Sequence, residues 1–124
     1  MDFYFDDCYW HDSIMESIYI DRSNPGYNDS IEITVEWYAD RSRAKLVFKK
    51  AYQFKANMNF GIIAHETIDT AYIAPSDDPD LLAFYKGWKG MFAHVKLNCY
   101  VIETLSTGGK LKILAENVEM IKLS

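Results

Sequence analysis

The sequence predicts a mainly β (α+β) fold, with an antiparallel sheet or a small β-sandwich of six or seven strands and one packed helix. Three observations lead to this prediction. Apolar and polar residues alternate in several segments, as in half-buried strands; helical spacing occurs in one segment; and turn-forming residues stand between the segments. With 124 residues, 49% of them apolar, the chain can build one core, so residues 1–124 are expected to form a single domain.

The first strands are expected in the N-terminal half. "SIYID", residues 17–21, alternates, and "IEITVEWYA", residues 31–39, alternates so regularly that its odd-numbered residues form an apolar face. From residue 44 to residue 60 the even-numbered residues are mostly apolar. This stretch is longer than an ordinary strand of roughly 5–6 residues, so a bulge or bend is expected near Lys50 and Ala51, where the pattern is interrupted.

A hairpin with its turn near Asp40 and Arg41 would join the second and third of these segments. The odd-numbered apolar residues of the second segment and the even-numbered apolar residues of the third lie on the same face only if the residue numbers of each cross-strand pair add up to an odd number. A short turn predicts that this sum is about 81. This register would set Glu36 beside Lys45, Glu32 beside Lys49, Val35 beside Leu46 and Ile33 beside Phe48. Such pairs of opposite charge contribute about 0.2–1 kcal/mol each.

The second half of the chain contains one further strand, the helix and a closing hairpin. "IIAHETIDTAYIA", residues 62–74, is rich in β-branched residues and is predicted to be a strand with Ile62, Ala64, Ile68 and Tyr72 on one face. A helix is predicted near residues 78–92, with Asp77 or Asp78 as its cap, Pro79 in its first turn and an end at Gly87 or Gly90. Two strands joined by a turn at residues 106–109 complete the chain.

The segment "YWHDSI" contains His11, Asp12 and Ser13 in sequence, the three residue types of a hydrolase triad. Neighbours in an extended chain point to opposite faces, so the imidazole cannot bridge the other two side chains. We therefore expect a turn in which Asp12 and Ser13 satisfy backbone amides before a strand, with Trp10 or His11 against the core.

Seven side chains could contribute to a metal site, but none of them stands at a spacing typical of metal ligands. They are Asp6, Asp7, His11, Asp12, His65, Glu66 and His94. No catalytic residue, metal or cofactor is predicted. The alternative function is a small metal-dependent or acid–base enzyme centred on His11, Asp12, His65 and Glu66.

The charge distribution indicates what kind of partner the protein binds. The net charge is −5, and residues 1–40 hold ten carboxylates against one base, Arg22, whereas residues 41–62 hold six bases and no acid. An acidic surface disfavours nucleic acid and anionic membranes and attracts a basic partner. No signal segment and no apolar run of about 20 residues is visible. Cys8 and Cys99 are too isolated for a disulfide framework, so a cytoplasmic protein is expected.

Three stretches resemble a known group of proteins: "FYFDDCYWHDSIMESIYIDRSNPG", "NMNFGIIAHETIDTAYIA" and "TLSTGGKLKILAENV". Similar segments occur in small bacterial proteins, some of which look like immunity proteins of polymorphic toxin systems. The resemblance implies a non-enzymatic protein that neutralises a basic toxin by binding it. The expected partner-binding residues are Asp6, Asp7, His11, Asp12 and Glu16. A homodimer formed through a strand edge or an aromatic face is a further possibility.

Overall fold

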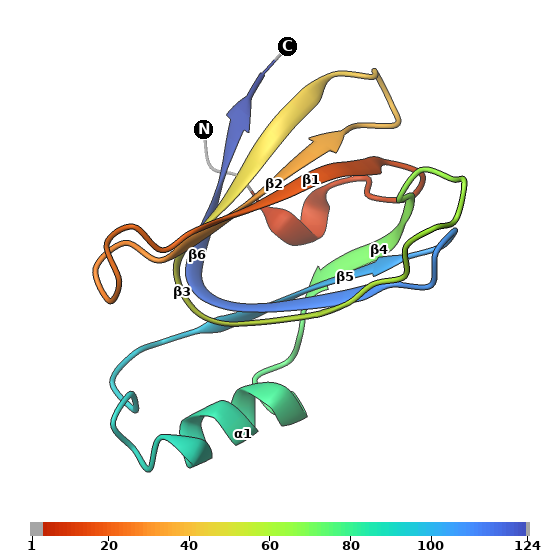
Figure 1. Cartoon of the computed structure of the whole chain (residues 1–124). Coiled ribbons are helices and arrows are strands. Elements are labelled where there is room, and N and C mark those ends of the chain that lie inside the picture. Colours follow the sequence, from red (N-terminus) through yellow and green to blue (C-terminus); the bar gives the residue numbers. More distant parts are fainter. Residues whose placement is uncertain (1–3, 124) are drawn as a thin grey trace.

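The alternating segments form an antiparallel sheet, and the segment with helical spacing forms a helix outside it (Figure 1). The computed structural model describes residues 4–123. Within this range the sheet has six strands in the order β1-β2-β3-β6-β5-β4. The elements are a 3-10 helix, η1 (Phe5–Asp7), then β1 (Ile14–Asp21), β2 (Ser30–Glu36), β3 (Arg43–Asn57), β4 (Ile68–Ile73), α1 (Pro79–Gly87), β5 (Asn98–Thr104) and β6 (Lys110–Lys122). The predicted mainly β class is confirmed, as one sheet and not a two-sheet sandwich.

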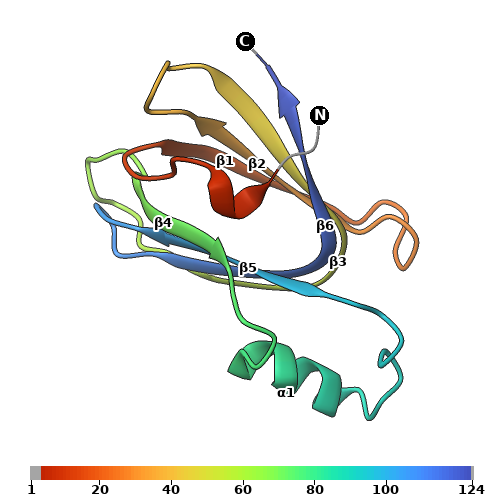
Figure 2. The same ribbon diagram turned by 180° about the vertical axis from the view of Figure 1, so that it is seen from behind.

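The sheet curls so strongly that its two outer strands meet (Figures 1 and 2). The meeting point lies between the start of β1 and the start of β4, where Ile14 pairs with Thr67. Ile68 extends this contact by donating its amide to the Ser13 carbonyl at 2.8 Å and accepting the Asp12 amide at 2.9 Å. These hydrogen bonds satisfy backbone N–H and C=O groups at the sheet edges, which would otherwise be free to pair with a strand of another chain.

The predicted bulge near Lys50 and Ala51 is confirmed, and it marks the bend of β3. Lys50 has a left-handed backbone with φ 52°, and the pairing of β3 with β6 shifts by one residue between Ala51 and Gln53. The extra residue is Tyr52, which packs outside the curled sheet with the cluster around α1. A bulge increases the bend and twist of a strand, and here it lets one continuous 15-residue strand turn around the core.

The curled sheet encloses the main core, and α1 covers part of its outer face. The enclosed side chains come from all six strands and from η1, and the largest fully buried ones include Phe5, Phe48, Leu46, Ile102 and Leu111. On the outside, Leu81 and Phe84 of α1 pack against Leu97, Cys99, Val101 and Leu114.

The helix begins as its sequence predicts. Asp78 accepts the amides of Asp80 and Leu81 at 3.0 and 3.2 Å, and Pro79 occupies the first helical turn. The helix ends at Gly87, the earlier of its two candidate ends.

The predicted register of the β2–β3 hairpin is wrong by two. Ile33 pairs with Leu46 and Val35 with Ala44, so the numbers of paired residues sum to 79 instead of 81. The sum is still odd, so both apolar sets face the core as expected. The reason is the turn, a four-residue loop closed by the Trp37 amide donating to the Ser42 carbonyl, in which Arg41 adopts φ 61°.

The predicted strand at residues 62–74 is correct only in its second half. Residues 62–66 form a loop that follows Gly61, which has φ 84°, and Ile62 and Ala64 are exposed. β4 begins at Ile68, and a register shift between Ile68 and Thr70 turns Tyr72 to the exposed face. The β-branched residues that suggested a strand therefore lie partly on the surface.

Candidate functional site

The "YWHDSI" segment forms the turn that brings the N-terminus to β1. Trp10 is buried and donates its indole N–H to the Phe5 carbonyl at 2.8 Å. The Ser13 hydroxyl is fully buried, donates to the Tyr9 carbonyl and accepts the Tyr38 amide at 3.0 Å. Asp12 helps to form the turn through its backbone, which adopts φ 68° at the point where the chain reverses direction. Ser13 thus satisfies a backbone amide as predicted, whereas among residues 4–123 no such bond is found for the Asp12 carboxylate.

His11 lies on the surface between two carboxylates. Its Nδ1 is 3.4 Å from Asp69 Oδ1 and 3.2 Å from the Asp69 carbonyl oxygen, and its Nε2 is 3.7 Å from Asp12 Oδ1. The Ser13 hydroxyl is engaged in the interior by Tyr9 and Tyr38. No hydrolase triad can form from these neighbours.

Two connected clefts lie where the start of β1, the 58–67 loop and the β2–β3 turn meet, and we call them together the acidic cleft. Their volumes are about 590 and 490 Å³, and Ile14, Glu36 and His65 line both. Their walls hold four carboxylates, which are Asp12, Glu16, Glu36 and Glu66. The fold therefore brings together four predicted residues, Asp12, Glu16, His65 and Glu66, and adds Glu36, which the sequence assigns to cross-strand pairing.

The carboxylates of the acidic cleft differ in how far the fold already uses them. Glu16 forms an ion pair with Arg43 at 2.8 Å, and Glu36 lies 3.6 Å from Arg41. Glu66 accepts the Thr107 hydroxyl. The nearest basic group to Asp12 is the His11 ring. The negative charge of Asp12 and Glu66 is thus not neutralised by Lys or Arg within residues 4–123.

The 58–67 loop is held against the β5–β6 turn. The side-chain amide of Asn59 donates to the Thr107 carbonyl at 2.7 Å, and the backbone amide of Leu105 donates to the Thr67 carbonyl at 2.8 Å. Gly109 is required for this fit, because an added Cβ would lie 2.9 Å from Thr104 Oγ1 and 3.2 Å from a Glu66 oxygen. The ends of the loop are therefore fixed.

The tip of this loop is apolar and exposed. Phe60 is 84% exposed, Ile63 is fully exposed and Ile62 is half-exposed. Exposed apolar residues that cluster beside polar ones commonly mark an interaction surface. The apolar tip of the loop and the carboxylates of the acidic cleft lie side by side, since Phe60 and Ile62 line the same cleft as Glu16 and Glu66.

The remaining predicted residues lie elsewhere. Asp6 accepts the Ile73 amide at 2.7 Å, so its carboxylate covers the far end of β4, and Asp7 is exposed beside it. Because Asp12 reaches the first residue of β4 and Asp6 its last, the two acids are separated by roughly 16 Å along the strand. His94 is exposed in the turns between α1 and β5. Among residues 4–123, no group of three or more His, Cys, Asp or Glu side chains is arranged to hold a metal ion.

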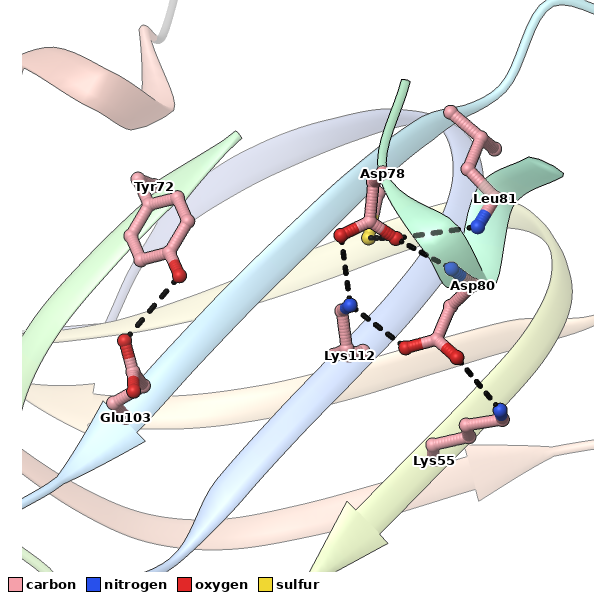
Figure 3. A network of polar contacts seen from close by, with 8 residues as sticks. Lys55, Tyr72, Asp78, Asp80, Leu81, Glu103 and Lys112 are labelled. Atoms are coloured by element: carbon pink, nitrogen blue, oxygen red, sulfur yellow. Dashed lines mark hydrogen bonds and ion pairs between the residues drawn. The ribbon is translucent and has the colours of Figure 1, made fainter. Parts of the chain in front are cut away.

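A partly buried charge network holds α1 on the sheet, and sequence reasoning missed it (Figure 3). Lys112 of β6 lies 2.8 Å from Asp78 and 2.7 Å from Asp80, and Lys55 lies 2.9 Å from Asp80. The hydrogen bonds from the two lysines lower the pKa of Asp80 to about 2. Burial alone would lower the pKa of Lys112, but hydrogen bonds with both carboxylates raise it. No sequence signal links residue 112 to the helix cap, since only the fold places them together.

Comparison with protein-family models gave no match, and comparison with curated proteins gave none either. The described helices include none with the length and apolar character needed to cross a membrane.

Proposed function

We propose that this protein is a non-enzymatic binding protein whose partner is a basic protein, in the manner of an immunity protein that occludes a toxin. The observation that carries the proposal is the acidic cleft, in which Asp12 and Glu66 have no Lys or Arg ion-pair partner among the described residues, beside the exposed apolar tip of Phe60 and Ile63. Charged groups around an apolar contact speed encounter and select the partner, while buried apolar side chains supply most of the affinity.

The partner-binding residues that we propose differ in part from those expected from sequence. Asp12 and Glu16 stay in the proposed surface, and Glu36, Glu66 and the apolar loop tip join them. His11 flanks this surface through its contact with Asp12. Asp6 and Asp7, at the other end of β4, are left as a secondary acidic region.

A reducing compartment such as the cytoplasm is part of the proposal. Cys8 and Cys99 are both free thiols, and Cys99 is buried. Burial raises the pKa of the Cys99 thiol to about 11, which keeps it protonated and unreactive at neutral pH.

The test is an affinity capture followed by reconstitution. Tagged protein is incubated with lysate of the source organism, and each captured protein is identified, purified and titrated against wild type and variants. One variant, D12N/E36Q, removes two acids from the cleft. Asp12 has no Lys or Arg partner among the described residues, and Glu36 is ion-paired to Arg41. The matched control, D77N/E119Q, removes an exposed acid and an acid ion-paired to Lys49 elsewhere. A third variant, I63S, alters a fully exposed side chain and leaves the core intact.

We expect a basic partner that binds with defined stoichiometry and binds less tightly as salt increases. Its affinity should fall about tenfold or more in D12N/E36Q and in I63S, and stay unchanged in the control. Equal affinity in all variants would contradict the proposed surface. Capture of a metal or small molecule in place of a protein would favour the alternative enzyme, because Asp12 and His65 line one cleft. Light scattering on the same samples tests the homodimer.

A further inference from the structure

A second cleft, distinct from the acidic cleft, has an aromatic wall. It has a volume of about 570 Å³ and lies between the β1–β2 loop, the bulge of β3 and the C-terminal end of α1 with the turns that follow it. Figures 1 and 2 place the β1–β2 loop and the segment after α1 on the same side of the molecule. Its volume falls within the range of small-molecule sites, about 300–1,000 Å³.

The wall is a set of rings in mutual contact. Tyr52 lies 5.2 Å from Phe92 and 6.0 Å from Phe84, measured between ring centroids, and Trp88 lies 5.3 Å from Phe92. Trp88 is half-exposed at the end of α1, and Tyr27 is 82% exposed in the β1–β2 loop. The cleft therefore offers a ring-shaped ligand one packed aromatic wall and one exposed tyrosine.

The backbone around the cleft takes an uncommon conformation. Lys50 adopts φ 52° inside a strand, where a residue other than glycine rarely does so. The bulge that follows is what turns Tyr52 outward into the aromatic wall. Such conformations and bulges concentrate at functional sites.

Two opposite charges face the cleft without neutralising each other. Lys49 pairs with Asn117 and Ala51 with Ala115, so Lys50 and Glu116 occupy facing positions on β3 and β6. Both line the cleft, yet neither side chain forms an ion pair in the part of the chain that the structure describes. Glu116 lies close enough to Tyr52 that it adds to the effect of burial in raising the pKa of the Tyr52 phenol. By contrast, Arg22 and Asp29 at the rim are already paired at 2.8 Å.

An unpaired ammonium and an unpaired carboxylate beside an aromatic wall match a ligand that carries both charges and a ring. A polyanion such as a nucleotide would set several negative charges against a single unpaired cation among the described residues of the cleft, Lys50, with the Glu116 carboxylate beside it, in a protein of net charge −5. A zwitterion meets no such repulsion, because its carboxylate faces Lys50 and its ammonium faces Glu116. We propose that this cleft binds a free aromatic amino acid, with the ring against Trp88 and Phe92.

The test titrates L-phenylalanine into the full-length protein and measures heat release, with saturation-transfer NMR as a second readout. Two analogues separate the charges: 2-phenylethylamine lacks the carboxylate, and 3-phenylpropionate lacks the ammonium. We expect saturable binding of one phenylalanine per chain, and about tenfold weaker binding of each analogue, because each leaves one charge of the protein unmatched.

Variants assign the binding to this cleft. K50G removes the ammonium and keeps a residue that adopts positive φ easily, and E116Q removes the carboxylate with little change in shape. Each should weaken phenylalanine binding about tenfold, whereas K86Q, on α1 outside the cleft lining, should not. The proposal is overturned by undetectable binding at about 10 mM phenylalanine, by an analogue that binds as tightly as phenylalanine, or by unchanged affinity in K50G and E116Q. None of these outcomes depends on the protein partner proposed above.

Discussion

Replacing Lys112 by methionine removes the cation that holds the first turn of α1 on the sheet. The side chains of Lys112, Asp78 and Asp80 are 15%, 10% and 28% exposed, so this is a largely dehydrated contact. Lowering the pKa of Asp80 from 3.8 to about 2 corresponds to about 2.5 kcal/mol of preference for the carboxylate in the folded state. Lys55 supplies part of this stabilisation of the Asp80 carboxylate, and solvent screens the contacts of both lysines. We therefore assign about 1 kcal/mol of it to Lys112.

Asp78 adds to this cost, because it loses its cation at a position that is 10% exposed and keeps hydrogen bonds from neutral donors, the Asp80 and Leu81 amides and the Cys99 thiol. An unmatched polar group of this kind costs about 1–3 kcal/mol. We therefore expect K112M to lower the free energy of unfolding by about 2–3 kcal/mol, and the melting temperature by roughly 8–12 °C for a chain of 124 residues.

The assay is urea unfolding at several pH values. A carboxyl group whose pKa is lowered by folding stabilises the protein above its unfolded pKa, and this stabilisation is lost as the pH falls toward the folded value. The difference in the free energy of unfolding between wild type and K112M should accordingly be largest at pH 7 and shrink between about pH 4 and pH 2. A double-mutant cycle that combines K112M with D80N should give a coupling free energy of about 1 kcal/mol between Lys112 and Asp80.

The matched control is K110M. Lys110 lies two residues earlier on β6, is exposed and forms no ion pair among the described residues. Its replacement should change stability by less than about 0.5 kcal/mol. The reasoning is refuted if K112M costs no more than K110M, or if its cost is the same at pH 2 as at pH 7.

Three further predictions concern single buried groups. Ser13→Ala should cost about 1–3 kcal/mol in urea unfolding, because the Tyr38 amide loses the hydroxyl that it donates to; a cost near zero would show that another acceptor replaces it. Gly109→Ala should cost about 1–3 kcal/mol, because its Cβ would lie 2.9 Å from Thr104 Oγ1; melting temperatures compared with wild type decide this. Cys99, with a pKa raised to about 11 by burial, should resist iodoacetamide at pH 8 in the folded protein and react in urea, as mass spectrometry of the Cys99 peptide will report.

The sequence predicts those parts of the fold that depend on near neighbours. The period-two alternation from residue 31 onward placed Ile33 and Val35 in the core, and the interruption at Lys50 placed the bulge. The Asp78–Pro79 start of α1 was readable because capping involves residues two and three positions apart.

The errors arise where a tertiary contact or a turn overrides the local pattern. The register of β2 and β3 depended on the turn formed between Trp37 and Ser42, whose length the alternation of side chains does not encode. The loop at residues 62–66 has strand-like composition, but it is held near its ends and not along its length: the β5–β6 turn contacts Asn59 and Thr67, and the Met15 amide of β1 donates to the Glu66 carbonyl.

For the candidate site, the sequence by itself determined the residue types and some local features: an acidic segment at residues 1–40, a turn at Asp12 and Ser13, and free thiols. Only the tertiary structure decided which acids lie together. Curling the sheet joins Ile14 to Thr67, and this contact gathers Asp12, Glu16, Glu36 and Glu66 around one cleft while it leaves Asp6 at the other end of β4. The physical reason is that strand alternation specifies which face a side chain occupies, whereas the bend of β3 and β6 specifies which faces meet.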